Sequence, residues 1–88
     1  MANFKRRADA VIAREVNDGV VLLDAEANRI HQLNRTAMFI WEHCDGHTAH
    51  NEIAVGLART YRADEKVVMD DVMETLQELK ALNLIVEA

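Results

Sequence analysis

Histidine and cysteine side chains gather near the middle of this chain, where they could together hold a metal ion. His43, Cys44, His47 and His50 lie within eight positions, and His31 precedes them. Imidazole and thiolate are ligands that zinc prefers. However, Cys44 falls on the apolar stripe of a predicted helix, and His43 points about 100° away from it around the helix axis. The spacing therefore favours a buried thiol with surface histidines and no metal or other cofactor; a structural zinc module is the alternative.

Other residue types that carry catalysis are missing or unsuitably placed. The chain contains no serine, which excludes a serine nucleophile. A buried thiol in apolar surroundings has a raised pKa and is a poor nucleophile, which argues against Cys44. The carboxylates Asp70, Glu74 and Glu78 recur at helical spacing, which is typical of a solvated helix face, whereas acid–base catalysis needs two carboxyl groups across a cleft. We therefore expect a protein without enzymatic activity and without catalytic residues.

Length and composition limit the class of protein. The chain has 88 residues, half of them apolar, and a formal net charge of −5. We expect one domain over residues 1–88, with residues 1–10 as a flexible N-terminal segment. The longest apolar run, Ala37 to Trp41, is five residues, far short of the ~20 that a membrane helix needs. With a single cysteine and no signal-peptide pattern, we expect a cytoplasmic monomer or weak homodimer that does not bind membranes.

Short apolar runs in the first part of the chain predict strands. They are rich in β-branched residues and lie at residues 11–16, 20–24 and 29–33. The intervening segments, Asn17-Asp18-Gly19 and Ala25 to Asn28, have the composition of hairpin loops. We predict a three-stranded antiparallel meander whose first and third strands are its edges.

From Asn34 onward the apolar residues repeat with a helical period. We expect three helices, capped at their N-termini by Asn34, Thr48 and Asp64. Gly46 suits the left-handed residue that ends the first helix, and residues 84–86 form an extended tail. The order β-β-β-α-α-α predicts a winged-helix-like α+β domain, in which a three-stranded antiparallel sheet packs on a three-helix bundle.

A winged helix raises nucleic-acid binding or transcriptional regulation as an alternative function. The predicted third helix contains only Lys66 and Lys80 as cations, against the acidic residues Asp64, Glu65, Asp70, Asp71, Glu74 and Glu78. DNA affinity rests on cations that neutralise phosphates, so this helix would be repelled from DNA. The short basic run Lys5-Arg6-Arg7 is typical of a solvated terminus. We therefore expect no nucleic-acid partner.

The third predicted strand offers a free edge with little protection. Of its residues Arg29, Ile30, His31, Gln32 and Leu33, Arg29 alone carries a full charge that would discourage strand pairing. If the third helix lies beside this edge, the two form a groove that accepts an extended peptide by strand addition. The helix wall of this groove would come from Met69, Val72, Met73 and Leu76. The alternatives are that both methionines are core residues, or that the Asp71 and Thr75 flank of the helix faces the peptide.

Five short motifs occur in order over most of the chain, from about Val11 to Val86. They are Ile30-His31-Gln32-Leu33-Asn34, Ile40-Trp41-Glu42, Asp45-Gly46-His47-Thr48, Asp71-Val72 with Leu76 and Leu79, and Asn83-Leu84-Ile85. In this arrangement the chain resembles the PqqD-like family. Where the family pattern has a glycine near its end, this chain has Asn83, a residue that also accepts a positive φ.

The resemblance implies both a fold and a function. It implies a winged-helix-like β3α3 recognition element, or peptide chaperone, for ribosomally synthesised and modified peptides. In the family, the leader of a precursor peptide lies along the third strand and against the third helix, which correspond to residues 29–33 and about 67–79 here. Such domains present the precursor to a modifying enzyme, often a radical S-adenosylmethionine enzyme. The resemblance leaves two alternatives for the pathway: that of pyrroloquinoline quinone, or that of another modified peptide.

Overall fold

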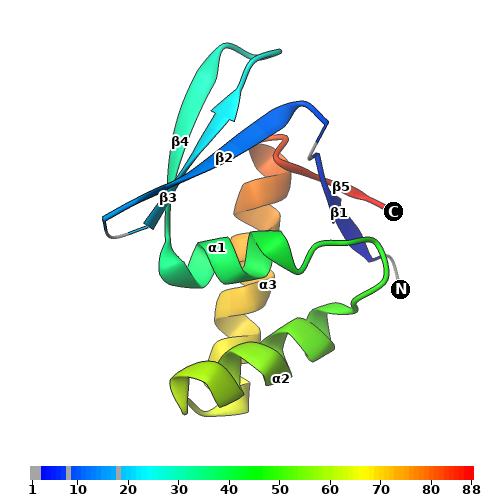
Figure 1. Cartoon of the computed structure of the whole chain (residues 1–88). Coiled ribbons are helices and arrows are strands. Elements are labelled where there is room, and N and C mark those ends of the chain that lie inside the picture. The colour runs from blue at the N-terminus through cyan, green and yellow to red at the C-terminus, as the bar shows by residue number, and fades with distance from the viewer. Residues whose placement is uncertain (1–2, 8, 18) are drawn as a thin grey trace.

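The computed structural model describes residues 3–7, 9–17 and 19–88 of the chain (Figure 1). In chain order its elements are β1 (Phe4–Arg6), β2 (Val11–Val16), β3 (Gly19–Asp24), β4 (Arg29–Asn34), α1 (Arg35–Glu42), α2 (His50–Tyr61), α3 (Glu65–Ala81) and β5 (Ile85–Glu87). β2, β3 and β4 form an antiparallel sheet in that order, and β1 pairs with β5 in a second, two-stranded sheet. The predicted α+β fold, with three antiparallel strands followed by three helices, is confirmed.

Local backbone requirements explain the two hairpins of the larger sheet. At Gly19, a Cβ atom would lie 2.2 Å from the carbonyl oxygen of Leu33, so only glycine lets β3 and β4 approach this closely. In the second loop Asn28 takes a positive φ of 54°, and the Asp24 carboxylate accepts a hydrogen bond from the Ala27 N–H at 3.1 Å. The Asp18 of the first predicted loop lies outside the described residues.

Side-chain caps determine where two of the helices begin. The Asn34 side chain accepts a hydrogen bond from the Ala37 N–H, and the Asp64 carboxylate accepts one from the Lys66 N–H, both at 2.8 Å. Each cap satisfies an N–H group that has no partner within its helix. The predicted starts of α1 and α3 are therefore confirmed.

The start of α2 differs from the prediction. Ala49, not Thr48, is its N-cap residue, and the Glu52 carboxylate accepts a hydrogen bond from the Ala49 N–H at 3.2 Å. Both the Thr48 N–H and the Thr48 hydroxyl donate instead to Asp45. The prediction of Thr48 as the cap was wrong because a carboxylate three residues earlier takes up its hydrogen-bonding groups.

The first helix is shorter than its apolar stripe suggested. α1 ends at Glu42 with His43 as its C-cap residue. Cys44 lies beyond the helix but is still fully buried. Gly46, expected to end the helix, takes its positive φ of 84° in the following loop.

The N-terminal segment is tied to the rest of the domain. β1 pairs with β5, so the predicted tail at residues 84–86 is largely a strand. The Arg6 guanidinium lies 5.9 Å from the centroid of the Trp41 ring, and it donates a hydrogen bond to the carbonyl oxygen of Glu42. The expectation of a flexible segment over residues 1–10 is therefore corrected for residues 4–7. These residues are held by strand pairing and by side-chain contacts with segments that are distant in sequence.

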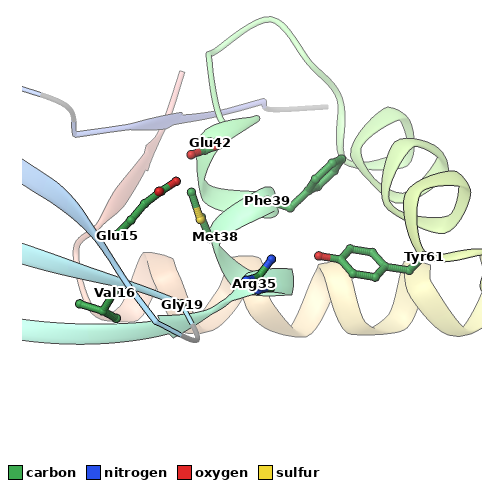
Figure 2. Close-up of a pocket in the computed structure, with 8 residues that line it drawn as sticks. All are labelled: Glu15, Val16, Gly19, Arg35, Met38, Phe39, Glu42 and Tyr61. Atoms are coloured by element: carbon green, nitrogen blue, oxygen red, sulfur yellow. The ribbon is translucent and has the colours of Figure 1, made fainter.

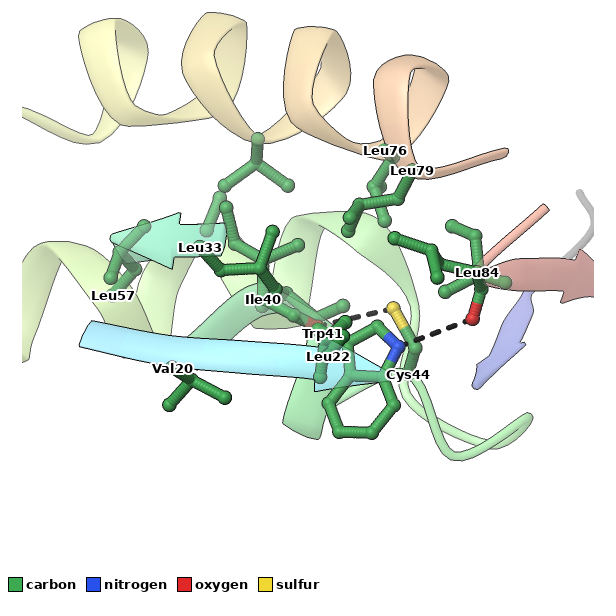
Figure 3. Packing of buried hydrophobic residues seen from close by; sticks show 14 of the residues in the cluster. Val20, Leu22, Leu33, Ile40, Trp41, Cys44, Leu57, Leu76, Leu79 and Leu84 are labelled. Atoms are coloured by element: carbon green, nitrogen blue, oxygen red, sulfur yellow. Dashed lines mark hydrogen bonds between the residues drawn. The ribbon is translucent and has the colours of Figure 1, made fainter. Parts of the chain in front are cut away.

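A single apolar core joins the sheet to the helices (Figure 3). The side chains of Leu22 from β3, Ile40 from α1 and Leu76 from α3 are completely buried in it. The Trp41 indole N–H donates to the carbonyl oxygen of Leu84 at 3.1 Å, which links α1 to the start of β5. One face of α3 is therefore used entirely to hold the domain together.

A buried ion pair connects the N-terminal segment to the second hairpin. The side chain of Asp24 is fully buried, and its Oδ2 atom lies 3.7 Å from Nη1 of Arg7, which also donates to the Asn83 carbonyl at 2.8 Å. The substitution Arg7→Met leaves this carboxylate buried without its cation. We expect the free energy of unfolding to fall by about 2–4 kcal/mol, measured by urea denaturation. The exposed Arg14 provides the matched control, and equal losses in Arg7→Met and Arg14→Met would refute a structural role for the pair.

Candidate functional site

β4 has an open edge. It pairs with β3 on one side, and no further strand adjoins it in the described part of the chain (Figure 1). In an antiparallel edge strand, alternate residues direct their N–H and C=O groups away from the sheet. β4 therefore presents backbone donors and acceptors to which an extended peptide can add as a fourth strand.

The side chains of β4 divide between two faces of the sheet. Leu33 is 7% exposed and joins the core, whereas Ile30, on the opposite face, is 72% exposed. Arg29 and Gln32 are also exposed. Leu33 therefore anchors the strand, and Arg29, Ile30 and Gln32 stay accessible along its edge.

His31 carries an unsatisfied polar atom on this strand. The residue is half-buried, and its Nε2 atom is inaccessible to solvent with no hydrogen-bond partner in the described part of the chain. Its cross-strand neighbour on β3 is Leu22, whose aliphatic side chain cannot supply a partner. A buried polar atom left unpaired costs about 1–3 kcal/mol, so His31 lowers the stability of the free domain.

The four residues predicted to form the helix wall separate into two groups. Met73 is 38% exposed, and Met69 is partly buried and packs against the core. Val72 and Leu76 are completely buried in the core cluster that also contains Leu33. Figure 3 shows Leu33 and Leu76 in this cluster. The assignment of Val72 and Leu76 as ligand contacts is corrected, because both lie in the centre of the stripe that attaches α3 to the domain. Of the predicted wall, Met73 and part of Met69 remain accessible.

The solvent face of α3 is strongly acidic. Its exposed residues include Asp70, Asp71, Glu74 and Glu78. Lys80, near the end of the helix, forms an ion pair with Glu87 of β5 at 3.0 Å. This face would repel phosphates and favours a partner that carries basic residues.

No helix of the described residues is long and apolar enough to cross a membrane.

The histidines and the cysteine do not form a metal centre. Within residues 3–7, 9–17 and 19–88, no group of three or more histidine, cysteine or acidic side chains comes close enough to hold an ion. His43 stacks on Phe39 with a centroid distance of 4.1 Å. The Asp45 carboxylate accepts hydrogen bonds from the His47 and Thr48 N–H groups, which lower its pKa. The side chains of His43 and Asp45 therefore have local structural contacts.

The thiol of Cys44 is predicted to be unreactive in the folded protein. Burial raises its pKa to about 12, and its Sγ atom donates to the carbonyl oxygen of Ile40 at 3.1 Å. At pH 8 the folded thiol therefore has on the order of 10³ times less thiolate than an exposed cysteine. We expect slow reaction with 5,5′-dithiobis(2-nitrobenzoate) and rapid reaction after unfolding in guanidinium. Equal rates in the two states would show that the thiol is accessible.

One hollow of the described surface is lined by residues that belong to neither β4 nor α3. It has a volume of about 300 Å³ and is lined by residues of β2, β3, α1 and the end of α2, among them Glu15, Met38 and Tyr61 (Figure 2). Sequence reasoning missed this hollow. The sequence around it, such as the apolar Val16 next to the charged Glu15, is common on solvated strands. It therefore could not reveal the hollow.

Comparison with known proteins links the chain to one family. Residues 19–85 match the family model described as coenzyme PQQ synthesis protein D (PqqD). This match extends from the start of β3 to the start of β5. A comparison with curated proteins found no match.

Three solved structures have a similar fold. TbiB1 in complex with the TbiA(beta) leader peptide is 26% identical, with a TM-score of 0.78 over 92% of this chain and 93% of that chain. Lasso peptide synthetase B1 complexed with the leader peptide is 23% identical, with a TM-score of 0.80 over 96% and 98% of the two chains. The PqqD truncation of Methylobacterium extorquens PqqCD, described as a functional and stand-alone RiPP recognition element, is 25% identical, with a TM-score of 0.73 over 97% and 87%.

Proposed function

The chain belongs to the PqqD family, and on that basis we propose that it binds the leader region of a ribosomally synthesised precursor peptide and presents it to a modifying enzyme. The observation that carries the proposal is the open edge of β4. The similar TbiB1 structure holds a leader peptide, and the Methylobacterium extorquens domain is described as a RiPP recognition element. In this role the chain is a non-catalytic cytoplasmic protein that requires no cofactor.

The leader adds to β4 as an extended strand and turns alternate side chains toward α3. We assign its contacts to Arg29, Ile30, His31 and Gln32 of β4 and to Met69 and Met73 of α3. Leu33, Val72 and Leu76 lie beneath them and keep the strand and the helix in position. The flexible thioether side chains of the two methionines suit a surface that adapts to different apolar anchors.

The expected affinity follows from a few contributions of known size. Each backbone hydrogen bond along β4 contributes about 0.5–1.5 kcal/mol net, and each apolar anchor about 1.5–3 kcal/mol. Ordering a flexible peptide offsets much of this gain. We expect micromolar binding, near −8 kcal/mol. Because the exposed face of α3 is acidic, the leader should carry basic residues beside its anchors and bind more weakly at high salt.

The enzyme that receives the bound precursor is proposed to be a radical S-adenosylmethionine enzyme. This proposal rests on the motif resemblance, and that enzyme, not this chain, would supply the cofactor chemistry. It is tested by adding the chain to each candidate enzyme encoded near its gene and measuring modification of the precursor. Stimulation of an enzyme of another class alone would replace this assignment.

Leader binding is tested by nuclear magnetic resonance on the ¹⁵N-labelled chain. The leader of the precursor encoded nearest to its gene is titrated in, with a scrambled leader of the same composition as the control. We expect amide shifts at residues 29–34 and along α3 with the native leader only. Shifts confined to α2 or to the β1–β5 sheet would place the peptide elsewhere and contradict the proposal.

The unpaired nitrogen of His31 yields a prediction with opposite effects on stability and binding. His31→Leu removes a buried polar atom that has no partner in residues 3–7, 9–17 and 19–88, so the free energy of unfolding should rise by up to about 1 kcal/mol. If the leader hydrogen-bonds to this nitrogen, its affinity should fall by about fivefold. Urea denaturation of His31→Leu measures the change in stability, and calorimetric titration with the leader measures the change in affinity, with His31→Gln as the variant that keeps a hydrogen-bonding group. Unchanged affinity in His31→Leu would show that the leader does not reach this atom.

A further inference from the structure

The hollow of about 300 Å³ forms a second accessible surface whose lining includes no described residue of β4 or α3. Two of its lining residues, Glu15 and Val16, belong to β2, which is the edge of the sheet opposite β4. The hollow is therefore separate from the residues assigned to the leader. A ligand seated there leaves the β4 edge free.

Apolar side chains line the hollow together with charged ones. Met38 and Phe39 of α1 are half-buried there. Val16 is 45% exposed and Tyr61 is 49% exposed. Large apolar side chains that remain this accessible around a depression are typical of a protein contact site.

Charges of opposite sign occupy different parts of this hollow. In Figure 2 the carboxylates of Glu15 and Glu42 lie on the same side of Met38, whereas Arg35 lies near the hydroxyl of Tyr61. Among the described residues, neither carboxylate forms an ion pair, and Arg35 forms none either. Two carboxylates on one side without a cation favour a partner that brings a positive charge to them.

We propose that this hollow docks the modifying enzyme, through a segment of that enzyme that carries a basic side chain next to an apolar one. The inference rests on the proposed function, because presenting a bound leader requires the chain to hold the enzyme with a different surface. The basic side chain pairs with Glu15 and Glu42, and the apolar one packs on Met38 and Phe39. The Arg35 guanidinium donates a hydrogen bond to an acceptor on the same segment, and this bond sets the orientation of the segment.

The size of the hollow defines its part in the complex. A stable interface involves about 20–30 residues on each partner, whereas eight residues line the hollow. The hollow therefore acts as the central anchor point, and the exposed outer edge of β2 supplies the surrounding contact area. This arrangement matches interfaces in which a few central residues carry most of the binding energy.

The test measures enzyme binding and leader binding separately. Glu15→Lys and Glu42→Lys each reverse a charge at the acidic side of the hollow, and Asp9→Lys makes the same change at an exposed residue outside it. The probe is the purified modifying enzyme encoded beside the gene of this chain, titrated without the leader. We expect Glu15→Lys and Glu42→Lys to weaken enzyme binding by at least about tenfold, and Asp9→Lys to have little effect.

Leader titrations on the same variants separate this inference from the proposed function. All three variants should bind the leader as the unmodified chain does, while modification of the precursor falls with Glu15→Lys and Glu42→Lys. Enzyme affinity that is equal in the three variants, or that falls equally in all of them, overturns the docking site. If the unmodified chain did not bind the leader, the proposed function would be refuted. The comparison of enzyme affinities among the variants would still be valid.

Discussion

Val72→Asp is expected to unfold the domain. Val72 is completely buried where α3 contacts the core, so its replacement places a carboxylate in an apolar environment. The loss of apolar burial and the cost of burying the charge together exceed about 5 kcal/mol, which is the whole stability of many small domains. Circular dichroism and the dispersion of amide resonances should both show an unfolded chain at 25 °C.

Val67→Asp is the matched control for this prediction. Val67 is on the same helix but is 60% exposed, and an acidic residue in the first turn of a helix is favourable. We expect this variant to keep the stability of the unmodified chain. A folded Val72→Asp protein would show that α3 is not attached to the core through this residue.

Met73→Asp is expected to keep the fold and to lose much of its affinity for the leader. Met73 is 38% exposed, so an aspartate at this position remains hydrated and costs little stability. The substitution removes an apolar contact that contributes about 1.5–2 kcal/mol at the proposed peptide surface. This loss corresponds to a dissociation constant that is about 10- to 30-fold higher. Fluorescence anisotropy with a labelled leader measures this change.

Val67→Asp again provides the comparison, since it adds the same charge to a different face of α3. Its leader affinity should change by less than about threefold, because a solvent-separated charge contributes little at physiological salt. If Met73→Asp binds the leader as tightly as Val67→Asp does, the peptide does not contact this flank. The flank with Asp71 and Thr75 would then be tested next by the same substitutions.

Local sequence was sufficient for most of the secondary structure. Asn34 and Asp64 act on N–H groups two or three residues away, so their capping roles could be identified from their positions. Thr48 fitted the same pattern, but its N–H and hydroxyl groups donate to Asp45, so it does not cap α2. Local patterns therefore fail where more than one partner is within reach.

Contacts between distant segments could not be predicted in this way. β1 pairs with β5 from opposite ends of the chain, and neither segment has a hairpin loop or a strand period long enough to reveal its partner. Arg7 looked like part of a solvated basic run, yet it pairs with the buried Asp24. Both contacts depend on the folded core bringing the two segments together.

By itself, the sequence determined the β-β-β-α-α-α order, the family and the acidic character of α3, because these depend on residue types and on short spacings. Only the tertiary structure decided which residues remain accessible at the site. It buried Val72 and Leu76, left Met73 exposed and left a nitrogen of His31 without a partner among the described residues. Accessibility depends on which elements pack together, and packing involves surfaces from distant parts of the chain. The hollow beside Tyr61 exists for the same reason, since β2, α1 and α2 meet there only after the chain has folded.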